Sequence, residues 1–138
     1  MTTQEMSGNE YKERGLVFAR RIFLIAGIYG VLVLIPQYFM ESRTGRDFPP
    51  AVTHPEYYYG FIGVALAWQV LFLIMARDPV RFRLVMVPAT LEKLSFGVAA
   101  VVLYLQGRLS TLMLAGGIVD LIFAGLFLAA FRATSDSP

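Results

Sequence analysis

The 138-residue sequence contains no cysteine and a single histidine, His54. Disulfides, thiolate-bound metals and c-type haem attachment are therefore excluded. Charged residues are scarce at 16%, whereas hydrophobic residues make up 57% of the chain. This balance is too apolar for an ordinary soluble domain and is typical of a protein that lies in a lipid bilayer. The net charge is only +2, so the overall charge gives no reason to expect a nucleic-acid partner.

Long apolar runs fill most of the chain. Four can be marked, at Ile22–Met40, Tyr57–Met75, Leu84–Leu105 and Leu109–Phe131. Each is close to the roughly 20 residues that a helix needs to span hydrocarbon. None shows the period-2 alternation of a membrane β-strand. We therefore expect a single membrane domain over residues 1–138, in which residues 1–21 form a polar N-terminal segment and no soluble catalytic domain is left over.

Short connections determine how these spans are arranged. Asp78-Pro79 interrupts the chain between the second and third spans, and Gly107 can supply the turn between the third and fourth. Connections this short make neighbouring helices run in opposite directions. The sequence thus predicts an all-α fold, an integral membrane four-helix antiparallel bundle. A kink or helix end is expected near Pro36.

Basic residues are distributed unevenly between the two ends of the predicted spans. One side has Lys12, Arg14, Arg20, Arg21, Arg77, Arg81, Arg83 and Arg132, and the other has only Arg43, Arg46 and Arg108. The positive-inside rule then places both termini in the cytoplasm, with the protein in the inner (cytoplasmic) membrane. We expect no cleaved signal peptide, because the first apolar run is long and lacks a small-x-small cleavage site. The short polar segment Ser135–Pro138 is expected to form the C-terminal tail.

Three charged residues lie inside the predicted spans: Glu92, Lys93 and Asp120. A charge at the centre of a membrane helix costs about 2.5 to 3.5 kcal/mol on insertion scales, so mutual pairing is favoured over exposure to lipid. We predict that Lys93 pairs with Asp120 across the third and fourth spans. The Glu92 side chain points about 100° from that of Lys93 around the helix axis. We expect Glu92 to pair with Tyr29 or Gln69, or to be protonated because it is removed from water.

Small residues share helix faces with these charges and indicate close helix packing. Ala89, Lys93 and Gly97 repeat every four residues in one span, as Gly116, Asp120 and Ala124 do in the next. Further glycines that predict close approach are Gly27, Gly30, Gly60, Gly63 and Gly117.

The polar residues lie at similar expected depths. Counted at 1.5 Å per residue from the cytoplasmic ends, they lie roughly 9 to 16 Å into the membrane. The predicted polar core consists of Tyr29, Gln69, Glu92, Lys93 and Asp120. One interpretation is a polar pocket or proton path. The other is that the group only fixes the register of the bundle.

The segment before the second span has His54 and Glu56, followed by Tyr57, Tyr58 and Tyr59. One imidazole and one carboxylate are too few for a convincing metal site, so no metal is predicted. The three tyrosines are expected to form an aromatic belt at the head-group level.

Several short motifs together resemble a family. The run Ala76-Arg77-Asp78-Pro79-Val80-Arg81, then Lys93, then Asp120-Leu121-Ile122, is similar to that of small bacterial four-span membrane proteins of the DoxX-like kind. Gly27-Ile28-Tyr29-Gly30 is similar too, while Phe82 and Glu92 depart from the pattern. The resemblance implies a four-helix bundle and, for some relatives, an association with quinone-linked redox complexes. It implies no catalytic residues.

No nucleophile motif, phosphate loop or dinucleotide-binding glycine pattern is present. The sequence therefore favours a binding or accessory subunit, which holds a lipid- or quinone-like molecule near the Glu92, Lys93 and Asp120 cluster or docks on a larger membrane complex. The alternative is a small membrane enzyme or proton-coupled carrier with Glu92 as the proton acceptor. A third hypothesis is a purely structural subunit, and homo-oligomers fit all three.

Overall fold

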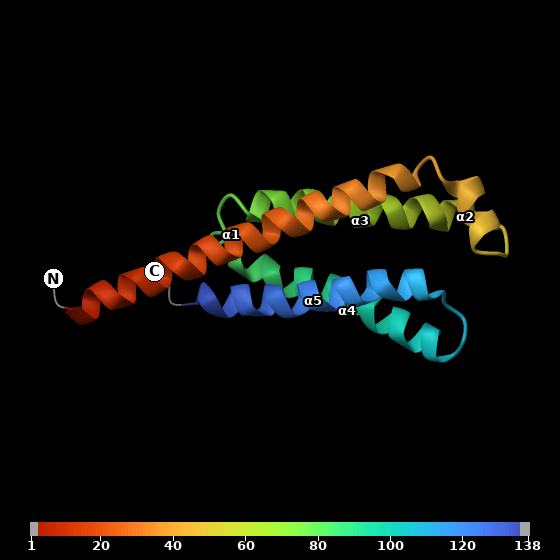
Figure 1. The fold of residues 1–138 in the computed structure, drawn as a ribbon. Coiled ribbons are helices and arrows are strands. Elements are labelled where there is room, and N and C mark those ends of the chain that lie inside the picture. The colour runs from red at the N-terminus through yellow and green to blue at the C-terminus, as the bar shows by residue number, and fades with distance from the viewer. Residues whose placement is uncertain (1–2, 136–138) are drawn as a thin grey trace.

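The structure, a computed structural model, describes residues 3–135, with side chains from residue 8 onward. The predicted C-terminal tail lies outside the described residues except for Ser135. The elements are α1 (Thr3–Gln37), α2 (Glu41–Asp47), α3 (Pro55–Met75), the short 3₁₀ helix η1 (Arg83–Val85), α4 (Met86–Leu105) and α5 (Thr111–Ala133) (Figure 1). Within residues 3–135 there is no strand. Four helices are long and apolar enough to cross a membrane, which confirms the all-helical, multi-pass prediction.

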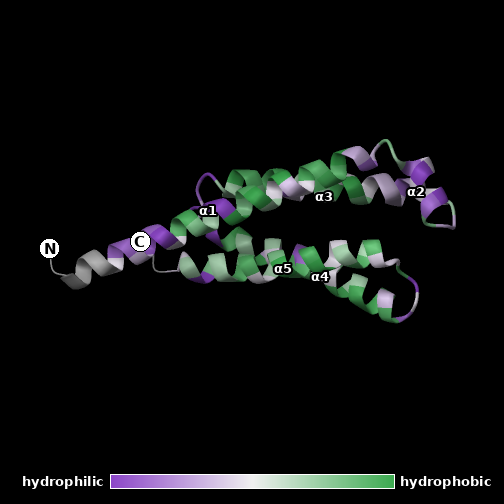
Figure 2. Cartoon of the chain, in the orientation of Figure 1, coloured by the Kyte–Doolittle hydropathy of each residue, from purple (hydrophilic) through white to green (hydrophobic). Residues whose placement is uncertain are grey.

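The first helix is much longer than the apolar run within it. α1 has 35 residues, which corresponds to about 52 Å of helix, whereas the hydrocarbon core is about 30 Å thick. The polar segment before Ile22 forms the first turns of the same helix. Figure 2 shows these turns as the hydrophilic part of α1. Pro36 lies at the end of α1, and the helix stops at Gln37.

The helices form two pairs. α1 packs against α3, α4 packs against α5, and α1 contacts α5. The pairs lie closest near the last turns of α5 and separate toward the end that holds α2 (Figure 1), here called the α2 end. Backbone contact between α3 and α4 is sparse. Their side chains approach at Phe61 and Phe96, whose ring centroids are 6.2 Å apart.

A cluster of aromatic rings joins the two pairs. Phe23 of α1 stacks on Phe127 of α5 at 4.3 Å between centroids, and Phe72 of α3 meets Phe127 edge-on at 5.0 Å. All three rings are fully buried, and α4 adds Met86 and Ala89 to the same core. We call this group the aromatic layer. Because it draws on all four long helices, it is the part of the core that holds the two pairs together.

Toward the α2 end the buried core narrows to a single pair. The second buried cluster consists of Leu34 from α1 with Ile62 and Ala65 from α3. Two of the predicted belt tyrosines tie this end together. The Tyr58 hydroxyl donates to the Gln37 carbonyl at 2.8 Å, and the Tyr59 hydroxyl donates to Glu41 at 2.7 Å. The predicted loop between the first two spans thus includes a helix, α2, attached to α3 by tyrosines.

The small residues divide into two sets. A Cβ atom on Gly27 or Gly30 would collide with α3, and one on Gly97 or Gly117 would collide with the facing helix of the α4–α5 pair. These glycines therefore permit close helix contact, as predicted. A Cβ on Gly60 or Gly116 would meet nothing within 4 Å, so those positions are open. Gly107 has a positive φ of 70° and forms the predicted turn.

Candidate functional site

Close approach of α4 to α5 brings Lys93 beside Asp120. Lys93 belongs to the buried stripe of α4, which has small residues one turn away on each side, Ala89 and Gly97. The Gly97 and Gly117 backbones are nearly in contact, since a Cβ on Gly97 would lie 3.0 Å from the Gly117 carbonyl oxygen. Without bulky side chains between them, the two helices place the lysine amine within reach of the carboxylate.

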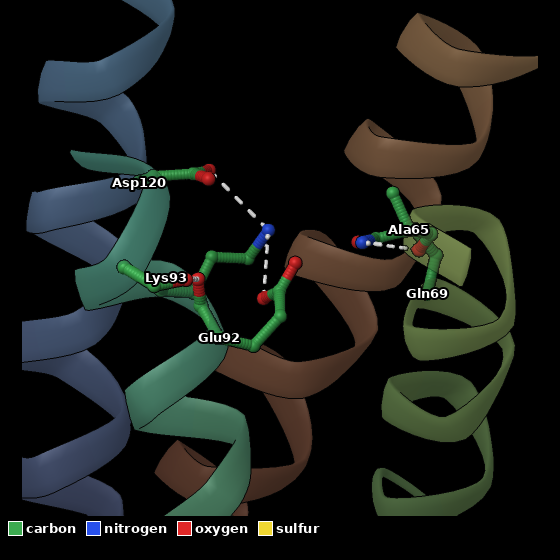
Figure 3. Close-up of polar contacts among 6 residues, drawn as sticks. Ala65, Gln69, Glu92, Lys93 and Asp120 are labelled. Carbon is green, nitrogen blue, oxygen red and sulfur yellow. Dashed lines mark hydrogen bonds and ion pairs between the residues drawn. The ribbon is translucent and has the colours of Figure 1, made fainter. Parts of the chain in front are cut away.

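The lysine amine lies between two carboxylates (Figure 3). Lys93 Nζ is 3.3 Å from Asp120 Oδ1 and 3.3 Å from Glu92 Oε2. The Lys93 side chain is 7% exposed, against 18% for Glu92 and 14% for Asp120. The structure therefore contains the predicted pairing of Lys93 with Asp120. It also pairs Glu92 with Lys93, where we expected Tyr29 or Gln69.

The reason for this difference is the reach of the lysine. Glu92 and Lys93 point about 100° apart at their Cα atoms, but four methylene groups allow the amine to return toward its neighbour's carboxylate. The contact is an ion pair without hydrogen-bond geometry, since Glu92 Oε2 is buried and accepts no hydrogen bond from residues 8–135.

Gln69 of α3 is almost completely buried, at 1% exposure. Its Nε2 donates to the Ala65 carbonyl at 2.9 Å, one turn earlier in the helix. That bond fixes the orientation of the amide, because the reversed amide would set two oxygens against each other. The Oε1 atom accepts no hydrogen bond within the described chain. Figure 3 shows the amide pointing from α3 toward the side on which Glu92 and Lys93 lie.

Gly30 makes room for this amide. A Cβ on Gly30 would collide with the Cγ, Cδ and Oε1 atoms of Gln69. The glutamine therefore lies flat on the α1 backbone, and only glycine fits opposite it. The sequence analysis marked Gly30 as a packing residue, but its specific partner is visible only in the structure.

The remaining member of the predicted polar core, Tyr29, is less closely integrated. It is 38% exposed, and its ring packs on Phe123 with 5.8 Å between centroids. Its hydroxyl forms no hydrogen bond within residues 8–135. The structure therefore groups Gln69, Glu92, Lys93 and Asp120, which we call the polar cluster, and leaves Tyr29 at its edge.

Sequence reasoning missed one residue of this site. The Phe72 ring centroid is 5.5 Å from Lys93 Nζ, a cation–π distance. Phe72 follows Gln69 by three residues on the same face of α3, and this spacing was a signal that we did not use. The polar cluster thus rests directly on the aromatic layer.

His54 pairs with the neighbouring carboxylate. His54 Nδ1 is 3.2 Å from Glu56 Oε1, and both side chains are about two-thirds exposed. No group of three potential metal ligands occurs in the described part of the chain. Two shallow surface hollows lie away from the polar cluster. One lies beside the first turns of α1 around Arg14, and the other lies along the Leu91–Arg108 side of α4.

These features define a class of protein: an all-helical, multi-pass membrane protein with a largely buried carboxylate–amine–carboxylate group on its α4–α5 pair. Comparison of the chain with protein-family models, with curated proteins and with solved structures found no match.

Proposed function

We propose that this protein is a small-molecule-binding subunit of the cytoplasmic membrane, which holds an amphiphilic, lipid- or quinone-like molecule at the polar cluster. The observation that carries the proposal is Gln69 Oε1, a buried atom that accepts no hydrogen bond within residues 8–135. Its amide points toward the side on which Glu92 and Lys93 lie (Figure 3). A buried amide oxygen without a hydrogen bond costs about 1 to 3 kcal/mol. A bound head group that donates to it removes this cost.

The location of the polar cluster also supports binding. It lies where the four-helix core ends and the two helix pairs separate. A molecule with a polar head and an apolar tail suits this place, because the head meets the cluster and the tail meets the apolar helix faces.

The test is to identify what the protein retains. The tagged protein is extracted with its surrounding lipid in polymer discs, and bound small molecules are identified by native mass spectrometry. We expect the wild type to retain an amphiphile that Gln69→Leu loses. Gln37→Leu is the matched control, because Gln37 makes the same side-chain bond to the carbonyl four residues earlier but lies in the exposed last turn of α1. Equal retention by both variants contradicts the proposal.

The same purification tests docking on a larger complex. The DoxX-like resemblance implies such an association for some relatives, and we propose it as the accessory form of the same function. A stoichiometric protein partner with no retained small molecule would establish that form and assign the polar cluster to bundle stability alone. A homo-oligomer would be recognised in the same spectra by its mass.

A second candidate function is a small enzyme or proton-coupled carrier that uses Glu92. Glu92 is the most exposed member of the polar cluster, with a side chain that is 18% exposed. Its Oε2 atom is buried and accepts no hydrogen bond within residues 8–135. A proton acceptor must be reachable and not already saturated. Under this function Glu92→Gln abolishes proton uptake by reconstituted vesicles under an imposed amine or quinol gradient. Uptake at the wild-type rate in a correctly folded Glu92→Gln variant excludes it.

For the arrangement in the membrane, we propose an antiparallel bundle with both termini in the cytoplasm. Arginine-rich connections at Arg77, Arg81 and Arg83 support this orientation. Because the chain has no cysteine, single-cysteine variants report sidedness cleanly. A membrane-impermeant maleimide added to intact cells should label Arg108→Cys and leave Arg81→Cys unlabelled. The reverse pattern would invert the proposed orientation.

A further inference from the structure

The polar cluster has an unequal number of positive and negative groups. Glu92 and Asp120 are both acidic, and Lys93 lies between them. Among the side chains of residues 8–135, Lys93 is the one base that is ion-paired with either carboxylate. With all three groups ionised, the cluster carries one uncompensated negative charge. An uncompensated charge in a membrane interior is unfavourable, so the group needs either a proton or a second cation.

The hydrogen-bonding groups show the same excess of acceptors. Gln69 Oε1 and Glu92 Oε2 are both buried and accept no hydrogen bond within residues 8–135. The lysine amine does not supply either bond, although it is 3.3 Å from Glu92 Oε2. A ligand head group that fits here must donate hydrogen bonds. A head group that only accepts, such as a carbonyl or a carboxylate, leaves both oxygens unsatisfied.

When Glu92 and Asp120 are both ionised, charge and hydrogen bonding together select one kind of head group. A hydroxyl can donate to one of the two oxygens, but it leaves the negative charge uncompensated. A quaternary ammonium compensates the charge but has no N–H to donate. A primary ammonium provides one positive charge and three donors, and so meets both requirements.

We propose that the polar cluster binds the ammonium group of a membrane-soluble primary amine whose apolar tail lies between the separating helix pairs. This inference rests on the proposed binding function and specifies its ligand class. The ammonium lies against Glu92 and Gln69, so that two amines and two carboxylates balance. Asp120 keeps its own pairing with Lys93 in this arrangement.

The test uses probes that differ only in the head group. The full-length protein is placed in nanodiscs of phosphatidylcholine, and binding of dodecylamine, dodecanol, dodecyltrimethylammonium and dodecanoic acid is followed by native mass spectrometry. We expect dodecylamine to bind at least tenfold more tightly than the other three. A charge-assisted hydrogen bond exceeds a neutral one by roughly that factor. If dodecanol or dodecanoic acid binds as tightly as dodecylamine, the inference is overturned.

Variants show which residues make the selection. Glu92→Gln removes the excess negative charge with little change of shape, so the tenfold preference for the amine should disappear. Asp120→Asn also removes one negative charge from the cluster. It is the variant to use if Glu92→Gln does not fold. Gln69→Leu should weaken dodecylamine and dodecanol together, whereas Gln37→Leu should weaken neither. An amine preference that persists in both carboxylate variants contradicts the inference.

Failure of the binding function and failure of the ligand class give different experimental results. If no probe binds in a way that depends on Gln69, the proposed binding function itself is wrong. If probes bind in a Gln69-dependent way but the amine is not preferred, the binding function stands and only the ligand class is wrong.

Discussion

Replacement of Lys93 by methionine tests the physical basis of the polar cluster. The substitution keeps an unbranched apolar side chain and removes only the amine. Glu92 and Asp120 then face each other without the cation that lies 3.3 Å from each. We expect Lys93→Met to lower the free energy of unfolding, whereas Asp120→Asn or Glu92→Gln should have a much smaller effect. The reason is that removing either carboxylate leaves one amine with one carboxylate.

The size of the effect follows from burial. Removing one partner of a buried ion pair costs about 3 to 5 kcal/mol. The two carboxylates are 18% and 14% exposed, so residual solvation favours the lower end, about 3 kcal/mol. For Asp120→Asn or Glu92→Gln we expect less than about 1 kcal/mol, as for a group that stays paired and hydrogen-bonded. The triple variant Lys93→Met, Glu92→Gln, Asp120→Asn has no charge left in the polar cluster. Its free energy of unfolding should therefore be close to that of the wild type.

The assay is equilibrium unfolding in mixed micelles of dodecylmaltoside and dodecyl sulfate, followed by circular dichroism. Lys12→Met is the control, because Lys12 is the other lysine of the chain and lies in the polar first turns of α1. If Lys93→Met destabilises no more than Asp120→Asn, the lysine is not holding two carboxylates together. If the triple variant is as unstable as Lys93→Met, the loss comes from packing and the electrostatic argument is wrong.

Two further predictions concern helix contacts, each checked in the same micelles. Gly30→Ala should lower the free energy of unfolding by about 1 to 3 kcal/mol, because the new Cβ collides with the Gln69 amide. In the control Gly116→Ala the new Cβ meets nothing within 4 Å, so the free energy of unfolding should not change. Equal effects of the two substitutions would refute the contact. Ser110→Ala should lower the free energy of unfolding by about 1 kcal/mol, because the Ser110 hydroxyl caps the first turn of α5. Ser110→Asp should keep the wild-type stability, because its carboxylate can also cap the helix. If Ser110→Asp is as unstable as Ser110→Ala, the cap is not the cause.

Hydropathy predicted the spans well because hydrophobic length is a property of local sequence. The expected ends Met75 and Leu105 coincide with the ends of α3 and α4. The beginning of α1 was not predicted, since hydropathy marks where apolar residues start and not where a helix starts. Lys12, Arg14 and their neighbours have good helix propensity, and no proline precedes Pro36 in α1. The helix therefore continues through the polar segment.

The sequence predicted which residues form the polar cluster, but only some of the contacts between them. Helical spacing identified Lys93 and Asp120 as partners because both share a face with small residues. The partner of Glu92 depended on the path of the lysine side chain, which spacing does not describe. The Nε2 atom of Gln69 is bonded to the Ala65 carbonyl, which turns Oε1 to a side where it accepts no hydrogen bond within residues 8–135. Such a choice between two side-chain orientations is made by three-dimensional surroundings.

The position of the polar cluster follows from helical spacing relative to the aromatic layer. In α3 the residue three positions before Phe72 is Gln69, and in α5 the residue three positions before Phe123 is Asp120. In α4 the residue four positions after Ala89 is Lys93. One turn beyond the aromatic and methionine core, these three helices therefore present polar groups at the same level.

One further turn toward the α2 end explains why the pairs separate. There α3 presents Ala65, α4 presents Gly97 and α5 presents Gly117, each in contact with the partner of its own pair. Such small residues bring the two helices of a pair together but project little toward the other pair. At this end the contact between the pairs is made by the Phe61 and Phe96 rings, whose centroids are 6.2 Å apart. We infer that aromatic residues at Gly97 or Gly117 would separate the helices of a pair, because even a Cβ at either position collides with the facing helix.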